Sequence, residues 1–138
     1  MRGKLIVLYG VNGVGKSTQA ARLVRRMRAN SLWVYSVKYP LYDIQPTGGI
    51  INEYLRGSNR FNLNPREFQI VQAVNRTQYD HTLRDMLLSG RYVVAEDYIA
   101  TSIAWGVAEG VRKDFLVTLN SHLVEEDIAI LLDGCRYG

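Results

Sequence analysis

Residues 10–18 carry side chains at spacings that could bind a nucleotide. They read GVNGVGKST and fit the pattern G-x-x-x-x-G-K-[ST]. Glycines in such a loop let successive backbone N–H groups turn inward around an anion. Lys16 would then reach the β- and γ-phosphates, and the Ser17 hydroxyl would ligate Mg²⁺. The residues expected to contact ATP are Gly10, Asn12, Gly13, Val14, Gly15, Lys16, Ser17 and Thr18.

The segments on either side of this loop favour that interpretation. Residues 4–9 (KLIVLY) form the apolar, β-branched run of a buried parallel strand. After the loop, apolar residues recur at helical spacing from Ala20 to Met27, with arginines between them. The order of strand, loop and helix puts the partial positive charge of a helix N-terminus at the anion site. The stretch therefore predicts a nucleotide-binding loop.

Two acids end a later apolar run, YVVAED. Glu96 and Asp97 stand where enzymes with such a loop keep an acid for Mg²⁺ or its coordinated water. Glu96 is nearer the strand and is our choice for this role. Lys16 and Glu96 are thus the predicted catalytic residues, and Ser17 and Glu96 the predicted metal ligands. Asp97 alternatively caps the helix that opens at Tyr98.

Strand and helix patterns alternate along the rest of the chain. Further strands are expected at 32–37, 91–97 and 127–133, and further helices at 50–57, 64–89, 98–109 and 112–123. The helix expected at 64–89 opens with a capping box, because Asn64 is followed by Pro65 and Glu67. This alternation predicts an α/β, three-layer P-loop NTPase fold, with a parallel sheet of about four strands and helices on both faces. Ligands of such sheets bind beyond the carboxyl ends of the strands.

Composition limits the classes of function. The 138 residues carry a net charge of +4, with basic residues scattered along the chain, which argues against a nucleic-acid partner. We find neither an apolar stretch of membrane-spanning length nor a signal peptide, and expect no membrane partner. A single cysteine, Cys135, excludes an internal disulfide and fits a reducing compartment. We therefore expect a cytoplasmic protein.

The order of several segments along the chain narrows the class of enzyme. KYP follows the second strand, and TGGIINEYLRG, AVNRTQYDHTLRDMLLSGRYVVAEDY, TSIAWG and EEDIAILLD come later in the chain. Together with the phosphate loop they resemble the thymidylate kinase family over essentially the whole chain. The resemblance implies a homodimer that transfers phosphate from ATP to dTMP with the help of Mg²⁺. The residues that it implies for binding the nucleoside monophosphate are Lys38, Tyr39, Arg76, Asp97 and Tyr98.

Some positions depart from the family pattern. Asp97 replaces an arginine that faces phosphate, and no arginine follows Pro40 after the second strand. Gln72 replaces the aromatic residue that stacks on thymine, whereas the arginine that contacts the base is kept as Arg76. Without the resemblance, an arginine at such a mid-helix position is usually solvated. Gly13 stands where some members have an arginine.

The family's mobile lid, with its catalytic arginines, lies beyond the fourth strand. We therefore expect residues 1–138 to form a single P-loop kinase-like domain that is truncated at its C-terminus relative to the family, with Arg136 as the first lid residue. Such a chain would bind nucleotides and transfer phosphate slowly. Its sheet would have an uncovered edge after the fourth strand.

Two other functions stay open from the sequence. A deoxynucleoside kinase would suit the glutamate at position 96 and the loss of phosphate-facing arginines, because its acceptor is a hydroxyl group that needs a general base. The chain could also be a catalytically weak remnant that binds nucleotides. The A-x-N-R helix favours the thymidylate kinase interpretation over both.

Overall fold

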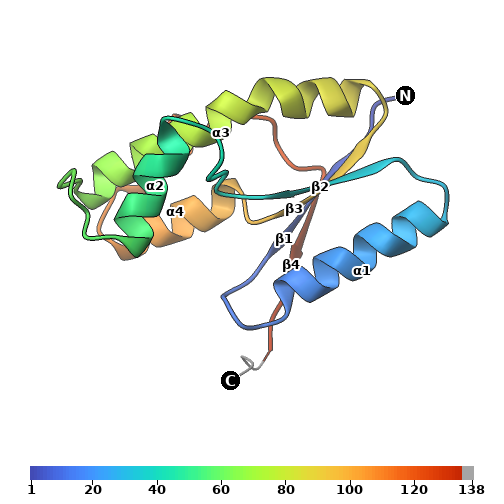
Figure 1. Cartoon of the computed structure of the whole chain (residues 1–138), viewed down its shortest axis with the longest axis horizontal. Helices are drawn as coiled ribbons and strands as arrows, with labels where there is room; N and C mark the ends of the chain where they lie inside the picture. The colour runs from blue at the N-terminus through green and yellow to red at the C-terminus, as the bar shows by residue number, and fades with distance from the viewer. Residues whose placement is uncertain (135–138) are drawn as a thin grey trace. The chain divides into compact units, whose positions relative to one another are not determined.

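The computed structural model describes residues 1–134 and alternates strands with helices in the predicted order (Figure 1). The strands are β1 (Leu5–Tyr9), β2 (Val34–Lys38), β3 (Tyr92–Glu96) and β4 (Ile128–Leu131). The helices are α1 (Lys16–Ala29), α2 (Thr47–Arg56), α3 (Pro65–Leu88), α4 (Ile99–Ala108) and α5 (Lys113–Leu119). None of the helices within residues 1–134 is long and apolar enough to cross a membrane. The predictions for Cys135 and Arg136 fall outside the described residues.

The four strands form the predicted parallel sheet, and their order in it is β2-β3-β1-β4. Leu8 of β1 pairs with Glu96 of β3, and Lys38 of β2 pairs with the same residue from the other side. The pairing continues past the strand ends, where Asp97 N donates to Leu8 O at 3.0 Å. The carboxyl ends of β1, β2 and β3 therefore lie together at one end of the sheet.

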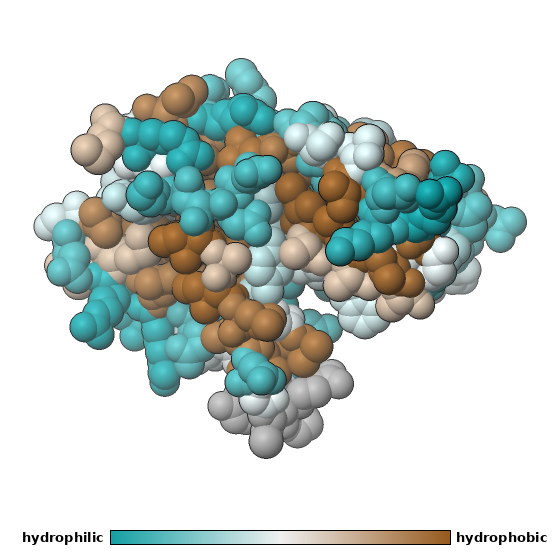
Figure 2. Space-filling model, turned by 180° about the vertical axis from the view of Figure 1, so that it is seen from behind, coloured by the Kyte–Doolittle hydropathy of each residue, from teal (hydrophilic) through white to brown (hydrophobic). Residues whose placement is uncertain are grey.

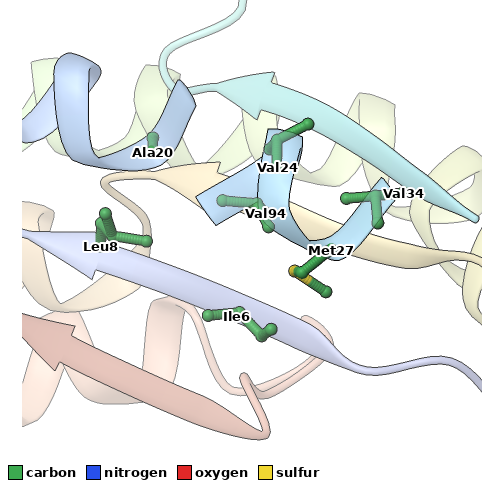
Figure 3. Close-up of a cluster of buried hydrophobic side chains, with 7 residues drawn as sticks. All are labelled: Ile6, Leu8, Ala20, Val24, Met27, Val34 and Val94. Atoms are coloured by element: carbon green, nitrogen blue, oxygen red, sulfur yellow. The ribbon is translucent and has the colours of Figure 1, made fainter. Parts of the chain in front are cut away.

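The chain divides into two compact units. The first consists of Met1–Tyr39, Thr82–Tyr98 and the segment from Val124 on, and holds the whole sheet with α1 and the end of α3. On one face of this sheet, side chains from β1, β2 and β3 pack against α1 (Figure 3). The members of this cluster are Ile6, Leu8, Ala20, Val24, Met27, Val34 and Val94.

The opposite face of the sheet is also buried. Side chains alternate along a strand, so Leu5, Val7 and Val93 point away from α1, and each is fully buried. The last turns of α3 belong to the same unit and contribute Leu83 and Leu87, both 1% exposed. Figure 1 draws α1 and the end of α3 on opposite sides of the strands. The predicted parallel sheet with helices on both faces is confirmed.

The β4 strand lies at the edge of the sheet, and all four of its residues are exposed. Asp127, just before β4, links this strand to the start of β1. Leu5 N donates to Asp127 Oδ2 at 2.8 Å, and Arg2 donates to the same oxygen at 3.0 Å. Burial acts to raise the pKa of Asp127, but these bonds outweigh it and hold the pKa below its usual value. The tie between β1 and β4 therefore weakens only when the pH falls through that lowered pKa.

The second unit, Pro40–His81 and Ile99–Leu123, contains α2, most of α3, α4 and α5. Its α5 helix ends at Leu119, four residues before the predicted end at 123. Asn120 is the cause, since its buried side-chain amide donates to Leu116 O at 2.8 Å. An asparagine that bonds the preceding turn in this way competes with continued helix.

The capping box predicted at the start of α3 is present. Glu67 N donates to Asn64 Oδ1 at 2.8 Å, and Asn64 N donates to Glu67 Oε1 at 2.9 Å. These two bonds satisfy backbone donors that the helix itself leaves without a partner.

Replacing Asn64 should test the contribution of this cap. Asn64→Ala removes the acceptor for Glu67 N and should lower the free energy of unfolding by about 1 kcal/mol in urea titrations. Asn52→Ala is the matched control, because Asn52 is exposed and accepts one bond from Arg56. The control should change stability by less than about 0.5 kcal/mol. Equal effects of the two variants would contradict the role of the cap.

Candidate functional site

The loop between β1 and α1 has the backbone that an anion-binding loop needs. Gly13 and Gly15 have φ values of 87° and 88°, which residues with a side chain rarely adopt. Gly15 occupies the N-cap of α1, which has no side-chain capping bond and no acid in its first turn. Gly13 is exposed and Gly15 half-exposed, so the start of α1 is accessible to a ligand. This helix terminus therefore attracts an anion through its own N–H groups and dipole.

Lys16 is buried against the base of this loop. Its Nζ donates to Gly10 O at 2.7 Å and to Asp97 Oδ2 at 2.7 Å, and its side chain is 9% exposed. The ammonium group thus lies where the chain leaves β1, beside the residue that follows β3. The sequence placed Lys16 in the site, but it did not predict this ion pair with Asp97.

Ser17 and Glu96 lie together, as the sequence analysis expects of two metal ligands. Ser17 Oγ donates to Glu96 Oε1 at 2.6 Å, and Glu96 is half-buried whereas Ser17 is exposed. A hydroxyl and a carboxylate oxygen are the hard donors that suit Mg²⁺, which usually keeps several waters. No group of three or more His, Cys, Asp or Glu within residues 1–134 could hold a metal. Mg²⁺ in phosphate-binding sites is usually held by one or two protein side chains, with phosphate oxygens and water as its other ligands, and this pair suits that arrangement.

Asp97 occupies the turn after β3 with an unusual backbone. Its φ of 62° lies in the left-handed region, where aspartate is tolerated better than most residues. Its N–H is held by Leu8 O, and its carboxylate is held by Lys16. The carboxylate next to Ser17 is that of Glu96, which supports our choice of Glu96 over Asp97 for the metal.

The remaining predicted residues of the first unit differ in exposure. Lys38 is exposed at the end of β2. Tyr39 and Tyr98 are 4% and 2% exposed, and their rings lie 5.0 Å apart at 45°. The Tyr98 hydroxyl donates to Val124 O at 2.6 Å. Both tyrosines therefore pack beneath the turns after β2 and β3, and both rings are buried.

Arg76 lies in the second unit and is 3% exposed, which excludes the solvated alternative. Its Nε and Nη2 donate to Asn120 Oδ1 at 3.2 and 2.8 Å, and its Nη1 donates to Ser102 Oγ at 2.8 Å. Asn120 and Ser102 are each 3% exposed. Gln72, which replaces the expected aromatic, is half-buried with its Oε1 3.5 Å from Ser102 Oγ. Sequence reasoning missed Asn120 and Ser102, because polar residues in helical segments give no signal of a shared partner.

A surface hollow of about 600 Å³ lies elsewhere in the second unit, beside the start of α3. It contains none of the predicted site residues. Arg66 lies over the Phe115 ring at 4.4 Å, and Arg112 is paired with Asp114 at 2.7 Å, so these charges are already engaged. The glycine loop and the two acids converge instead at the carboxyl ends of β1 and β3.

Comparison with known proteins agrees with this geometry. The family model described as thymidylate kinase matches residues 8–136. Protein 251L of Invertebrate iridescent virus 6, which carries the family's name, is 31% identical over 133 residues, covering 96% of this chain and 61% of its own. A thymidylate kinase of Dictyostelium discoideum is 29% identical over 132 residues, covering 95% and 58%. The chain thus spans about three fifths of the length of these curated relatives.

Solved structures share the fold. The thymidylate kinase of Candida albicans superposes with a TM-score of 0.80 at 27% identity, covering 96% of this chain and 63% of its own. The enzyme from Ehrlichia chaffeensis has the same TM-score at 18% identity, and this similarity shows a shared fold. The predicted P-loop NTPase fold is confirmed.

The buried polar cluster around Arg76 should be sensitive to the loss of one acceptor. Asn120→Leu leaves two guanidinium N–H groups without their bonds to Oδ1 and should lower the free energy of unfolding by about 2–3 kcal/mol. Asn52→Leu, at an exposed position, should change it by less than about 0.5 kcal/mol. Chemical denaturation of both variants measures the difference. A change below 0.5 kcal/mol for Asn120→Leu would show that the cluster does not depend on this side chain.

Proposed function

Because this chain belongs to the thymidylate kinase family, we propose that it transfers the γ-phosphate of ATP to dTMP, giving dTDP and ADP. This proposal rests on one observation: Lys16 and the Ser17–Glu96 pair lie together at the carboxyl ends of β1 and β3. An oxygen of the dTMP phosphate would attack the γ-phosphorus, and the bridging oxygen would leave with ADP. Such transfer depends on positioning and on cations that balance the developing charge.

The residues of the first unit would hold the donor. The backbone N–H groups of residues 10–18 and the ammonium of Lys16 would bind the β- and γ-phosphates, with Gly13 and Gly15 letting the backbone approach closely. Ser17 and Glu96 would hold Mg²⁺, which neutralises charge on the phosphates when it is bound. Glu96 orients Ser17 through their hydrogen bond, so the two oxygens act as one unit.

We propose acceptor roles for the other predicted residues. Lys38 is an exposed cation at the end of β2 and would meet the phosphate of dTMP. Tyr39 and Tyr98 would shape the turns that the nucleoside contacts, and Asp97 would lie on the acceptor side of Lys16. Arg76 would contact the base, with its guanidinium fixed by Asn120.

We further propose a cytoplasmic homodimer without nucleic-acid or membrane partners. Hydrophobic residues interrupt the hydrophilic surface (Figure 2). Ile70 and Val74, one turn apart on α3, and Trp105 on α4 are 38%, 45% and 61% exposed. Exposed apolar residues on α3 and α4 support association with a second copy through these helices.

Coupled measurement of ADP release tests the reaction. ATP, Mg²⁺ and dTMP should give turnover that requires dTMP, while thymidine should give none. Lys16→Ala should abolish both this turnover and the rise in melting temperature that ATP–Mg²⁺ causes, because the phosphates lose their lysine. The apo variant should remain folded. Turnover with thymidine and not with dTMP would refute the proposal, as would an undiminished thermal shift in Lys16→Ala.

The metal assignment has its own test. Ser17→Ala and Glu96→Gln should each weaken ATP binding in the presence of Mg²⁺ by about tenfold, and should change it little in EDTA. Glu126→Gln is a control in the same unit, since this carboxylate is bonded to the Tyr9 hydroxyl at 2.9 Å. Isothermal titration calorimetry with and without Mg²⁺ separates the two effects. Equal losses with and without the metal would contradict the assignment.

A further inference from the structure

The ion pair between Lys16 and Asp97 puts a carboxylate where the proposed phosphates would meet the loop lysine. Two of the three N–H donors of the ammonium group are used by Asp97 Oδ2 and Gly10 O, each at 2.7 Å. The two side chains are 9% and 19% exposed, so solvent screens this pair less than a surface pair. One donor of Lys16 is left for a phosphate oxygen.

The sheet fixes the position of Asp97. Its N–H bonds to Leu8 O at 3.0 Å, one step beyond the pairing of Leu8 with Glu96. Its φ of 62° turns the chain sharply at this point. A triphosphate in the loop would therefore meet a carboxylate that the backbone holds in place beside Lys16.

We propose that Asp97 limits the affinity of the loop for nucleoside triphosphate by competing with the phosphates for Lys16. A carboxylate in direct contact with the ammonium cancels much of its field, and the same carboxylate repels phosphate oxygens a few ångströms away. This inference rests on the proposed function only in taking ATP as the ligand. Asp97 is thus a residue that sets affinity from within the site.

The neighbouring acid has the opposite effect. Glu96 bonds Ser17 instead of Lys16, and would attract the metal that accompanies the phosphates. Removal of the charge at 96 should therefore weaken binding of the Mg²⁺ complex, whereas removal of the charge at 97 should strengthen binding. Two adjacent carboxylates with opposite effects on one ligand distinguish direct competition from a general loss of negative charge.

Calorimetric titration with ATP tests the inference. Asp97→Asn keeps the shape of the side chain and removes its charge, and asparagine is tolerated at positive φ. This variant should lower the dissociation constant for ATP by about tenfold. Asp97→Gly suits the same backbone without any carboxylate and should act in the same direction. The gain should be larger without Mg²⁺, because the metal neutralises part of the charge that Asp97 repels. Glu126→Gln, the control, should leave the dissociation constant within twofold.

Three results would overturn the inference. They are an unchanged dissociation constant in both Asp97 variants, weaker binding in both, or a gain of equal size in Glu126→Gln. Weaker binding would mean that Asp97 positions Lys16 or holds the metal. Failure of the wild-type chain and both variants to bind ATP would refute the proposed function as well. Binding by the wild-type chain without a gain in the variants would refute this inference alone.

Discussion

The parallel pairing of β1 with β3 is the constraint on which the candidate site depends. Leu8 lies opposite Glu96, so the chain leaves both strands at the same level, and Asp97 N closes the pairing on Leu8 O. This register puts Lys16 and Ser17, which follow β1, beside two acids that follow β3. A slip of one residue would exchange the faces to which Glu96 and Asp97 point and would separate each acid from its partner. Packing on both faces of the sheet fixes the register and so positions the site.

The two acids interact with different groups of the site. Glu96 bonds a hydroxyl, so its charge remains available to a cation, whereas the charge of Asp97 is largely balanced by Lys16. In the second unit, the buried Arg76 guanidinium donates to the amide oxygen of Asn120 and to the Ser102 hydroxyl. Polar groups buried in this way are costly unless every donor finds a geometrically suitable acceptor. The positions of Asn120 and Ser102 are therefore as important to Arg76 as its own place on α3.

Local patterns in the sequence predicted much of the fold. The apolar run of β1, the glycine loop and the Asn64–Glu67 box each carry their own signal within a few residues. The assignment of Glu96 to the metal stays a prediction, and its hydrogen bond with Ser17 is consistent with it. The ion pair of Lys16 with Asp97 was not predicted, because it depends on the direction of a side chain in a left-handed turn. The early end of α5 was missed for a similar reason, as it depends on how Asn120 uses its amide.

We infer that the turns after β1 and β3 form one nucleotide site. Titration of the ¹⁵N-labelled protein with ATP–Mg²⁺, followed by amide chemical shifts, tests it residue by residue. The largest changes should fall on residues 10–18 and on Glu96 and Asp97, and both segments should respond with the same dissociation constant. Changes centred instead on the hollow beside Arg66 and Phe115, with residues 10–18 unaffected, would rule out a nucleotide site at these turns.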